Sequence, residues 1–349
     1  MTRKFYINTA LLILTILAPF IFPVWKTQLA TLWLFIIVAL TWDMTGGQMG
    51  YNSLGNIFFY GTGMYVCAVI AIGMYFPFGE WTDASRSETW KFTDSQYFTG
   101  MILGSLGAGI FCALCAYILG GLFFGLRGPY FAIGTLGLAI ATGEIVSNID
   151  WLGGGQGVSM PIYNGDFEIF KNIIYYLFAG LGVGLFIFLN WFYKTRFGAA
   201  INAIRDDEEK AEAMGIHTLR YKLVTWSISA FFIGVAGAIS AFQLIHFEPL
   251  ETAYQTINLG IFMVVCVLLG GKGTLWGPVI GAFMFHVFKE VTWNYFLGWQ
   301  WVALGALIVV IVVFFQDGLM GYLQTRFPEW FGIKVVDRDE KETVAEPAE

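Results

Sequence analysis

The sequence predicts an all-α integral membrane protein, a bundle of about ten transmembrane helices (range about 8–10) with both termini in the cytoplasm. Two observations predict the class. Of the 349 residues, 57% are hydrophobic and 13% are charged, whereas a soluble domain has roughly 25% charged residues. Apolar segments also recur at about the 20-residue length that a helix needs to cross the hydrocarbon core. The length favours one bundle without a second sizeable domain.

The predicted spans follow from these apolar segments. They cover residues 7–25, 28–43, 53–76, 98–125, 130–148, 171–193, 223–245, 256–270, 276–297 and 299–316. Small residues one helical turn apart let membrane helices approach closely. Four such pairs predict tight packing: Gly100/Gly104, Gly121/Gly125, Gly180/Gly184 and Gly277/Gly281.

The distribution of basic residues predicts the orientation. If the N-terminus is cytoplasmic, the outer loops 77–97, 149–170 and 246–255 contain Arg86 and Lys91 as their basic residues, whereas the inner loop 194–222 alone contains six. Cytoplasmic loops are the ones enriched in Lys and Arg. We therefore expect a transmembrane domain over 1–325, with a cytoplasmic loop at 194–222, and a disordered cytoplasmic tail over 326–349.

Residue patterns for several kinds of chemistry are missing from the sequence. It has no P-loop motif, its three histidines lack metal-ligand spacing, and no basic patch indicates nucleic acid binding. We expect a non-enzyme without a metal or cofactor of its own. Ionisable residues inside predicted spans are functional candidates, because charge in hydrocarbon is costly. Glu144 either lines a pathway or pairs with a neighbouring helix, and His286, Lys289 and Glu290 predict an internal ion pair.

The cytoplasmic segment 197–216 predicts one short amphipathic helix. Gly198 and Gly215 bracket it, and Gly215 is a natural stop. Its apolar positions recur at helical spacing, interrupted at Glu208, and its other face is charged. The apolar positions are Phe197, Ile201, Ile204, Ala211 and Met214, and the charged ones are Arg205, Asp206, Asp207, Glu209, Lys210 and Glu212. Such a face binds either a groove on another protein or the membrane surface. Anionic lipid would repel the acidic face, which favours a protein partner.

Five stretches in order resemble the permeases of branched-chain amino acid ABC transporters, specifically the LivM-type subunit. One consists of residues 198–208, 211–216, 221–223 and 229–238. The others are GQMGYNSLG (47–55), LRGPYFA (126–132), LGGGQG (152–157) and GGKGTLWGP (270–278). Each motif is weak alone, but together they cover most of the chain, from about residue 45 to 290.

The resemblance implies a permease subunit of a bacterial inner-membrane importer that works by alternating access. Its partners would be a second homologous permease, two cytoplasmic subunits that hydrolyse ATP with Mg²⁺, and a periplasmic solute-binding protein. It also implies roles for particular residues. The candidates for coupling to the ATPase are Phe197, Gly198, Ile201, Ile204, Arg205, Asp206, Asp207, Glu208, Ala211, Glu212, Met214 and Gly215, and the candidates for the pathway are Gln48, Ser53, Tyr130 and Glu144.

Two departures from the family pattern leave the solute open. Family members often have a basic residue at the position of Ser147 and a histidine at that of Asn56. Branched-chain or other aliphatic amino acids are the first expectation, and urea or another small amide is the second, because related urea permeases share most of these motifs. An ion-coupled secondary transporter or channel is the alternative from a different class, although the few intramembrane acids argue against a proton relay. A structural scaffold is the third.

Overall fold

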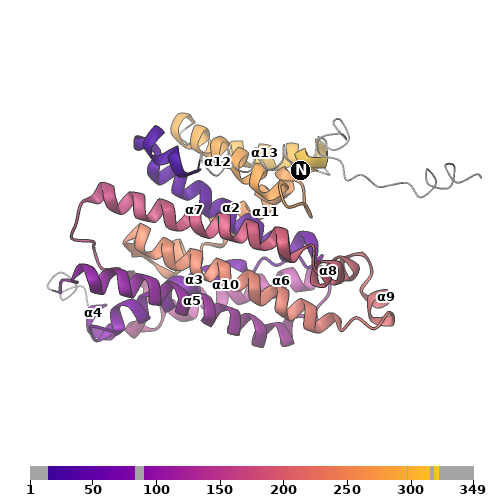
Figure 1. Cartoon of the computed structure of the whole chain (residues 1–349), viewed down its shortest axis with the longest axis horizontal. Helices are drawn as coiled ribbons and strands as arrows, with labels where there is room; N and C mark the ends of the chain where they lie inside the picture. The colour runs from indigo at the N-terminus through magenta and orange to yellow at the C-terminus, as the bar shows by residue number, and fades with distance from the viewer. Residues whose placement is uncertain (1–14, 83–89, 297, 315–317, 322–349) are drawn as a thin grey trace, which may run out of the picture.

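The computed structural model describes residues 15–82, 90–296, 298–314 and 318–321. Long helices lie side by side along the longest axis of the molecule (Figure 1). The helices of the bundle are α2 (Lys26–Asp43), α3 (Asn56–Gly73), α5 (Asp94–Phe123), α6 (Pro129–Ser147), α7 (Phe167–Phe192), α10 (Thr218–Leu244), α11 (Ile261–Gly270), α12 (Gly277–Tyr295) and α13 (Gln300–Phe314). The elements at its ends are α4 (Phe78–Trp81), α8 (Arg196–Asp206), α9 (Glu208–Ala213), β1 (Val158–Ser159) and β2 (His246–Phe247).

The all-α membrane class is confirmed. Six helical stretches of the described chain are long and apolar enough to cross a membrane, and α11 and most of α13 are shorter apolar helices. The predicted spans match the observed helices to within about five residues, because hydropathy locates segment ends to roughly this precision. Residues 15–21 are a helical part of the first predicted span. The start of that span and the predicted tail at 326–349 lie outside the described residues.

Helices α3, α5 and α10 make the most extensive contacts in the bundle, and each packs against the other two. Glycines bring α3 and α10 together. A Cβ at Gly63 would overlap the backbone oxygen of Gly234, and a Cβ at Gly237 would overlap that of Tyr60. Small residues at such crossings are how helices gain van der Waals contact in lipid, where apolar burial alone gives no driving force.

Two of the four predicted glycine pairs pack as expected. Gly100 and Gly104 of α5 lie against α3, and Gly277 and Gly281 of α12 lie against α11 and the loop that follows it. The prediction was wrong for the other two pairs. A Cβ at Gly121, Gly180 or Gly184 would meet nothing within 4 Å, and one at Gly125 would meet only an oxygen of its own helix end at 3.7 Å. Spacing alone does not say which helix face turns inward.

The two ends of the bundle differ in their elements. Helices α8 and α9 lie at one end, and α4 lies at the other (Figure 1). At the α4 end, β1 and β2 pair in antiparallel register, with Val158 opposite Phe247. Because α10 begins next to α9 and ends next to β2, it connects the two ends.

Candidate functional site

The segment 196–213 forms two helices, so the prediction of one continuous helix was wrong. Helix α8 ends at Asp206, and Asp207 is extended, with φ −163° and ψ 105°. The Asp207 side chain accepts a hydrogen bond from the backbone nitrogen of Lys210 at 3.1 Å and so caps α9. An aspartate N-cap favours the start of a new helix over the continuation of the old one. Gly215 stands just after α9 with φ +86°, as a helix stop requires.

The apolar face of this segment is not open to a partner, contrary to the expectation from its pattern. Ile201, Ile204 and Ala211 are buried inside the chain itself. Phe197 is partly buried and packs its ring against Tyr221 of α10 at 4.8 Å between centroids. Met214 alone among the five apolar positions is exposed, at 84%. The segment therefore attaches to the bundle through its apolar face and presents Met214 and its charged side chains outward.

Glu208, the residue that interrupts the apolar pattern, forms a buried ion pair. Its carboxylate lies 2.6 Å from the Lys222 ammonium of α10 and accepts a hydrogen bond from the Tyr51 hydroxyl. The Lys222 ammonium also lies 4.8 Å from the centre of the Tyr51 ring. Burial raises the pKa of Glu208, but the hydrogen bonds from Lys222 and Tyr51 outweigh it, so the pKa lies below the ordinary value. Glu208 thus joins α9 to α10 and to the loop before α3.

A second polar cluster lies beside the first, where α2 meets the loop between α11 and α12. The backbone nitrogen of Gly273 donates to Asp43 at 2.7 Å, and its backbone oxygen accepts from the Gln48 side chain at 2.7 Å. Lys272 donates to Asn52 at 3.3 Å. Burial lowers the pKa of Lys272, although nearby Asp43 opposes that shift. Gly273 has φ +77°, a conformation that side chains other than glycine rarely adopt.

The exposed side of α8 and α9 borders a groove of about 350 Å³. The groove lies between the loop at 49–51, residues 127–128 and residues 204–209. Arg127 reaches across it to Glu209 at 3.2 Å, and both side chains are mostly exposed. A groove of this kind, lined by side chains of both signs of charge, can bind another protein.

The structure separates the four candidate pathway residues into two pairs. Gln48 and Ser53 are buried, close to the clusters around Gly273 and Glu208. Tyr130 and Glu144 lie on the exposed face of α6, and Tyr130 is 73% exposed. They stand on one stripe of that helix together with Ile133 and Gly137, because residues three and four apart share a face. The glutamate has no ion pair within the described residues.

Sequence reasoning missed Lys222 and Tyr51, the partners of Glu208. A signal was available, since a glutamate in the middle of an otherwise apolar stripe needs a partner when that stripe is buried. Asn56, one of the two departures from the family pattern, is fully buried, and neither side-chain polar atom has a partner in the described chain. The described residues also contain no group of three His, Cys, Asp or Glu side chains that could hold a metal ion.

Comparisons with known proteins show which protein family this chain resembles. The family model for the permease component of branched-chain amino acid transport systems matches residues 27–314. The chain is 28% identical over 343 residues to the high-affinity branched-chain amino acid transport system permease protein LivM of Escherichia coli K12, covering 89% of this chain and 73% of that one. It is 23% identical to the probable branched-chain amino acid transport permease LivM of Methanocaldococcus jannaschii, over 82% and 90% of the two chains.

The chain is also similar, over a smaller share of its length, to permeases that are named for other solutes. It is 25% identical to the fructose import permease protein FrcC of Rhizobium meliloti, over 62% of each chain. No solved structure matches the chain. The family match covers most of the chain, including the helices of the bundle and the segment from α8 to α9. The chain therefore belongs to the family of permease components of branched-chain amino acid transport systems.

Proposed function

We propose that this chain is the membrane-spanning permease subunit of an ATP-driven importer in the bacterial inner membrane. Its partners are a second, homologous permease, two cytoplasmic subunits that hydrolyse ATP with Mg²⁺, and a periplasmic solute-binding protein. The chain is not an enzyme and holds no cofactor. Relatives named as branched-chain amino acid permeases support the solute class, with urea or a small amide as the second candidate. The fructose permease among the relatives shows why the permease fold alone does not define the solute.

The permease domain covers residues 1–325 and crosses the membrane about ten times, with both termini and the tail at 326–349 in the cytoplasm. The basic residues of the loop at 194–222 support this orientation. The same orientation places α8, α9 and the clusters around Glu208 and Gly273 on the cytoplasmic side. It places α4, β1 and β2 on the outer side, where the solute-binding protein docks.

The segment from α8 to α9 couples this subunit to an ATPase. The observation that carries this proposal is that the segment has two different sides. Its inner side is attached to the bundle through buried apolar residues and the Glu208–Lys222 ion pair, and its outer side is exposed. A segment built this way transmits a displacement to α10 because it cannot move far without moving that helix. Met214 is the apolar contact for the ATPase, and the exposed side chains of Arg205, Asp206 and Glu212 supply polar contacts from the same segment. Ile201 and Ile204 hold the segment in place.

The solute pathway runs along the exposed face of α6. A glutamate on a membrane helix is too costly to leave in hydrocarbon without a partner or water. Glu144 and Tyr130 therefore face the second permease across a pathway that contains water. Gln48 and Ser53 belong to the cytoplasmic end of this route, where alternating access closes the pathway.

The coupling proposal is tested by the variant Met214→Glu in the assembled transporter in proteoliposomes. The control is Met74→Glu at the far end of α3, because Met74 is also an exposed methionine, at 44%. We expect M214E to reduce ATP-dependent uptake at least about tenfold, as loss of about 1.4 kcal/mol at an interface contact would do. We expect M74E to leave uptake unchanged.

Uptake by M214E at the normal rate would refute ATPase contact at this residue. Uptake by the purified chain alone, driven by an ion gradient without any ATPase, would instead support a secondary transporter.

A further inference from the structure

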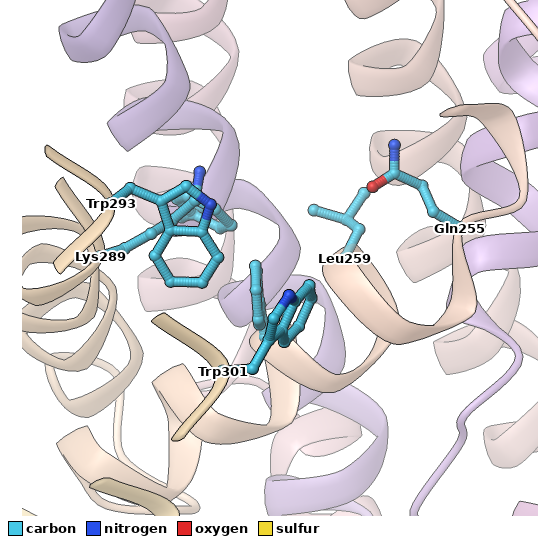
Figure 2. Close-up of a pocket in the computed structure, with 7 residues that line it drawn as sticks. Gln255, Leu259, Lys289, Trp293 and Trp301 are labelled. Atoms are coloured by element: carbon cyan, nitrogen blue, oxygen red, sulfur yellow. The ribbon is translucent and has the colours of Figure 1, made fainter. Parts of the chain in front are cut away.

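A pocket of about 240 Å³ lies between α2, α12, α13 and the helical turn that precedes α11. It is separate from α6 and from the segment of α8 and α9. Figure 2 shows Lys289 and Trp293 on one side, Leu259 and Gln255 on the other, and Trp301 between them. The lining residues are Phe35, Gln255, Leu259, Phe262, Lys289, Trp293 and Trp301.

Lys289 supplies a positive charge that forms no ion pair within the described residues, although the neighbouring Glu290 is close enough to attract it. Its ammonium lies 5.4 Å from the centre of the Phe35 ring and 6.0 Å from that of Trp293. The ion pair with Glu290 that the sequence predicted does not form, and no described carboxylate lies within ion-pair distance of Lys289. Aromatic faces stabilise an ammonium only in part, so this side of the pocket is a place for an anion.

The depth of Lys289 distinguishes it from an ordinary lysine at a membrane surface. It lies six residues before the end of α12 at Tyr295, about 9 Å along the helix. A lysine near a helix end usually extends its ammonium toward the interface. Here the ammonium lies over the Phe35 ring of a neighbouring helix instead. One turn before it, the Nδ1 atom of His286 is buried with no partner in the described chain. This part of α12 therefore holds more polar groups than the described chain satisfies.

The lining selects one kind of ligand by charge. It contains a cation and an amide, and none of its side chains is acidic. A zwitterionic amino acid would leave its own ammonium unpaired there, next to Lys289. Four aromatic side chains and a leucine favour an apolar body joined to the acid group. Trp301 is 49% exposed, and Val302 and Val309 of the same helix are also exposed, so the pocket opens onto an apolar surface.

We propose that this pocket binds an acidic amphiphile of the membrane, with its phosphate or carboxylate on Lys289 and its acyl chain along Trp301. The site goes beyond solute transport and does not depend on which solute is carried. The head group supplies the anion that Lys289 lacks, and the acyl chain stays in the bilayer.

Native mass spectrometry of the purified full chain tests this proposal. Phosphatidylglycerol and phosphatidylcholine with the same acyl chains compete for the protein at equal concentrations. We expect the first bound lipid to be phosphatidylglycerol by roughly fivefold, since one lysine near an anionic head group contributes about 1 kcal/mol. The variant Lys289→Met should remove the preference, and Lys289→Arg should keep it. Lys171→Met is the matched control, because it removes the same charge from a lysine paired with Glu168 at the end of α7.

The proposal is overturned if the unchanged protein shows no preference, or if K289M keeps it. K289R provides a second variant with the charge intact should K289M not fold. Oleate added in competition identifies the source of the anion. Displacement of phosphatidylglycerol assigns the site to a free fatty acid as well, and no displacement assigns it to the phospholipid.

Discussion

Helices α10 and α6 are both apolar enough to cross a membrane, but α10 is mostly buried and α6 is mostly exposed. Their most apolar windows have mean hydropathies of 1.8 and 1.4, yet 67% of the α10 window is buried and only 28% of the α6 window. Each helix also carries a charge near one end. Lys222 of α10 is buried and paired with Glu208, whereas Glu144 of α6 is exposed and has no ion pair in the described chain. The first charge holds the fold together, and the second is available to a solute or a partner.

The largest effect on the stability of the protein is expected from Lys222→Met, which would leave Glu208 and Tyr51 without their buried cation. Loss of one member of a buried pair costs about 3–5 kcal/mol. The expected result is a marked decrease in the melting temperature of the purified protein. The control is Arg127→Met, which removes the exposed partner of Glu209 and should leave the melting temperature unchanged, because exposed ion pairs contribute little. Equal decreases in both variants would mean that Lys222 is not a structural charge.

The next largest effect on stability is expected from replacing a glycine in α10, and the same replacement in α6 should have little effect. Gly237→Ala in α10 places a methyl group against the backbone oxygen of Tyr60, and such overpacking costs about 1–3 kcal/mol. Gly137→Ala in α6 meets nothing within 4 Å and should be neutral or stabilising by up to about 1 kcal/mol. Denaturant titration in detergent measures both. A loss of stability in G137A but not in G237A would mean that α6, and not α10, is the tightly packed inner helix.

A smaller effect is expected from pH. The pKa of Glu208 is lower in the folded protein than its ordinary value. Its contribution to stability is therefore complete above the ordinary carboxyl pKa and is lost as the pH falls through the lowered value. A spin label on the exposed position Ala213 should become mobile as the pH falls through this lowered pKa of Glu208, below the ordinary carboxyl range. In the variant Glu208→Gln the label should be mobile at neutral pH already. A transition in E208Q at the same pH would assign the effect to another acid.

The smallest effect on stability is expected from Glu144→Gln. Exposed positions usually change stability by less than about 0.5 kcal/mol. Uptake by the assembled transporter should nevertheless decrease about tenfold, which corresponds to ~1.4 kcal/mol in the transport barrier. Glu290→Gln in α12 is the control, because this acid lies away from the exposed face of α6. Uptake by the E290Q variant should be unchanged. Normal uptake by E144Q would remove Glu144 from the pathway.

The sequence predicted the limits of the individual helices better than it predicted which helices pack together. Hydropathy marks where a helix enters lipid, but α10 and α6 have similar hydropathy, so it does not distinguish an inner helix from an outer one. The glycine pairs illustrate the same difficulty. Gly277/Gly281 forms a tight crossing and Gly180/Gly184 does not, although their spacing is identical. Which face packs depends on contacts between segments far apart in the chain.

The candidate coupling segment was located from the sequence, but its internal structure was not. The apolar stripe continues from Ile201 to Ala211 as if one helix carried it, and the extended residue Asp207 interrupts the backbone without interrupting the stripe. The burial of that stripe could not be read from periodicity, because a stripe that packs on its own bundle has the same pattern as one that binds a partner. The ion pair of Glu208 depends on a lysine 14 residues later.

The pairing of β1 with β2 also bears on how the protein is made. Ser159 of β1 has as its partner His246 of β2, 87 residues later in the chain. At about 5–20 residues per second, a ribosome needs roughly 4–17 s to reach the second strand after the first. During that interval α7, α8, α9 and α10 are synthesised while β1 has no partner. The loop at 149–166 thus cannot complete its pairing until the chain has been made as far as β2.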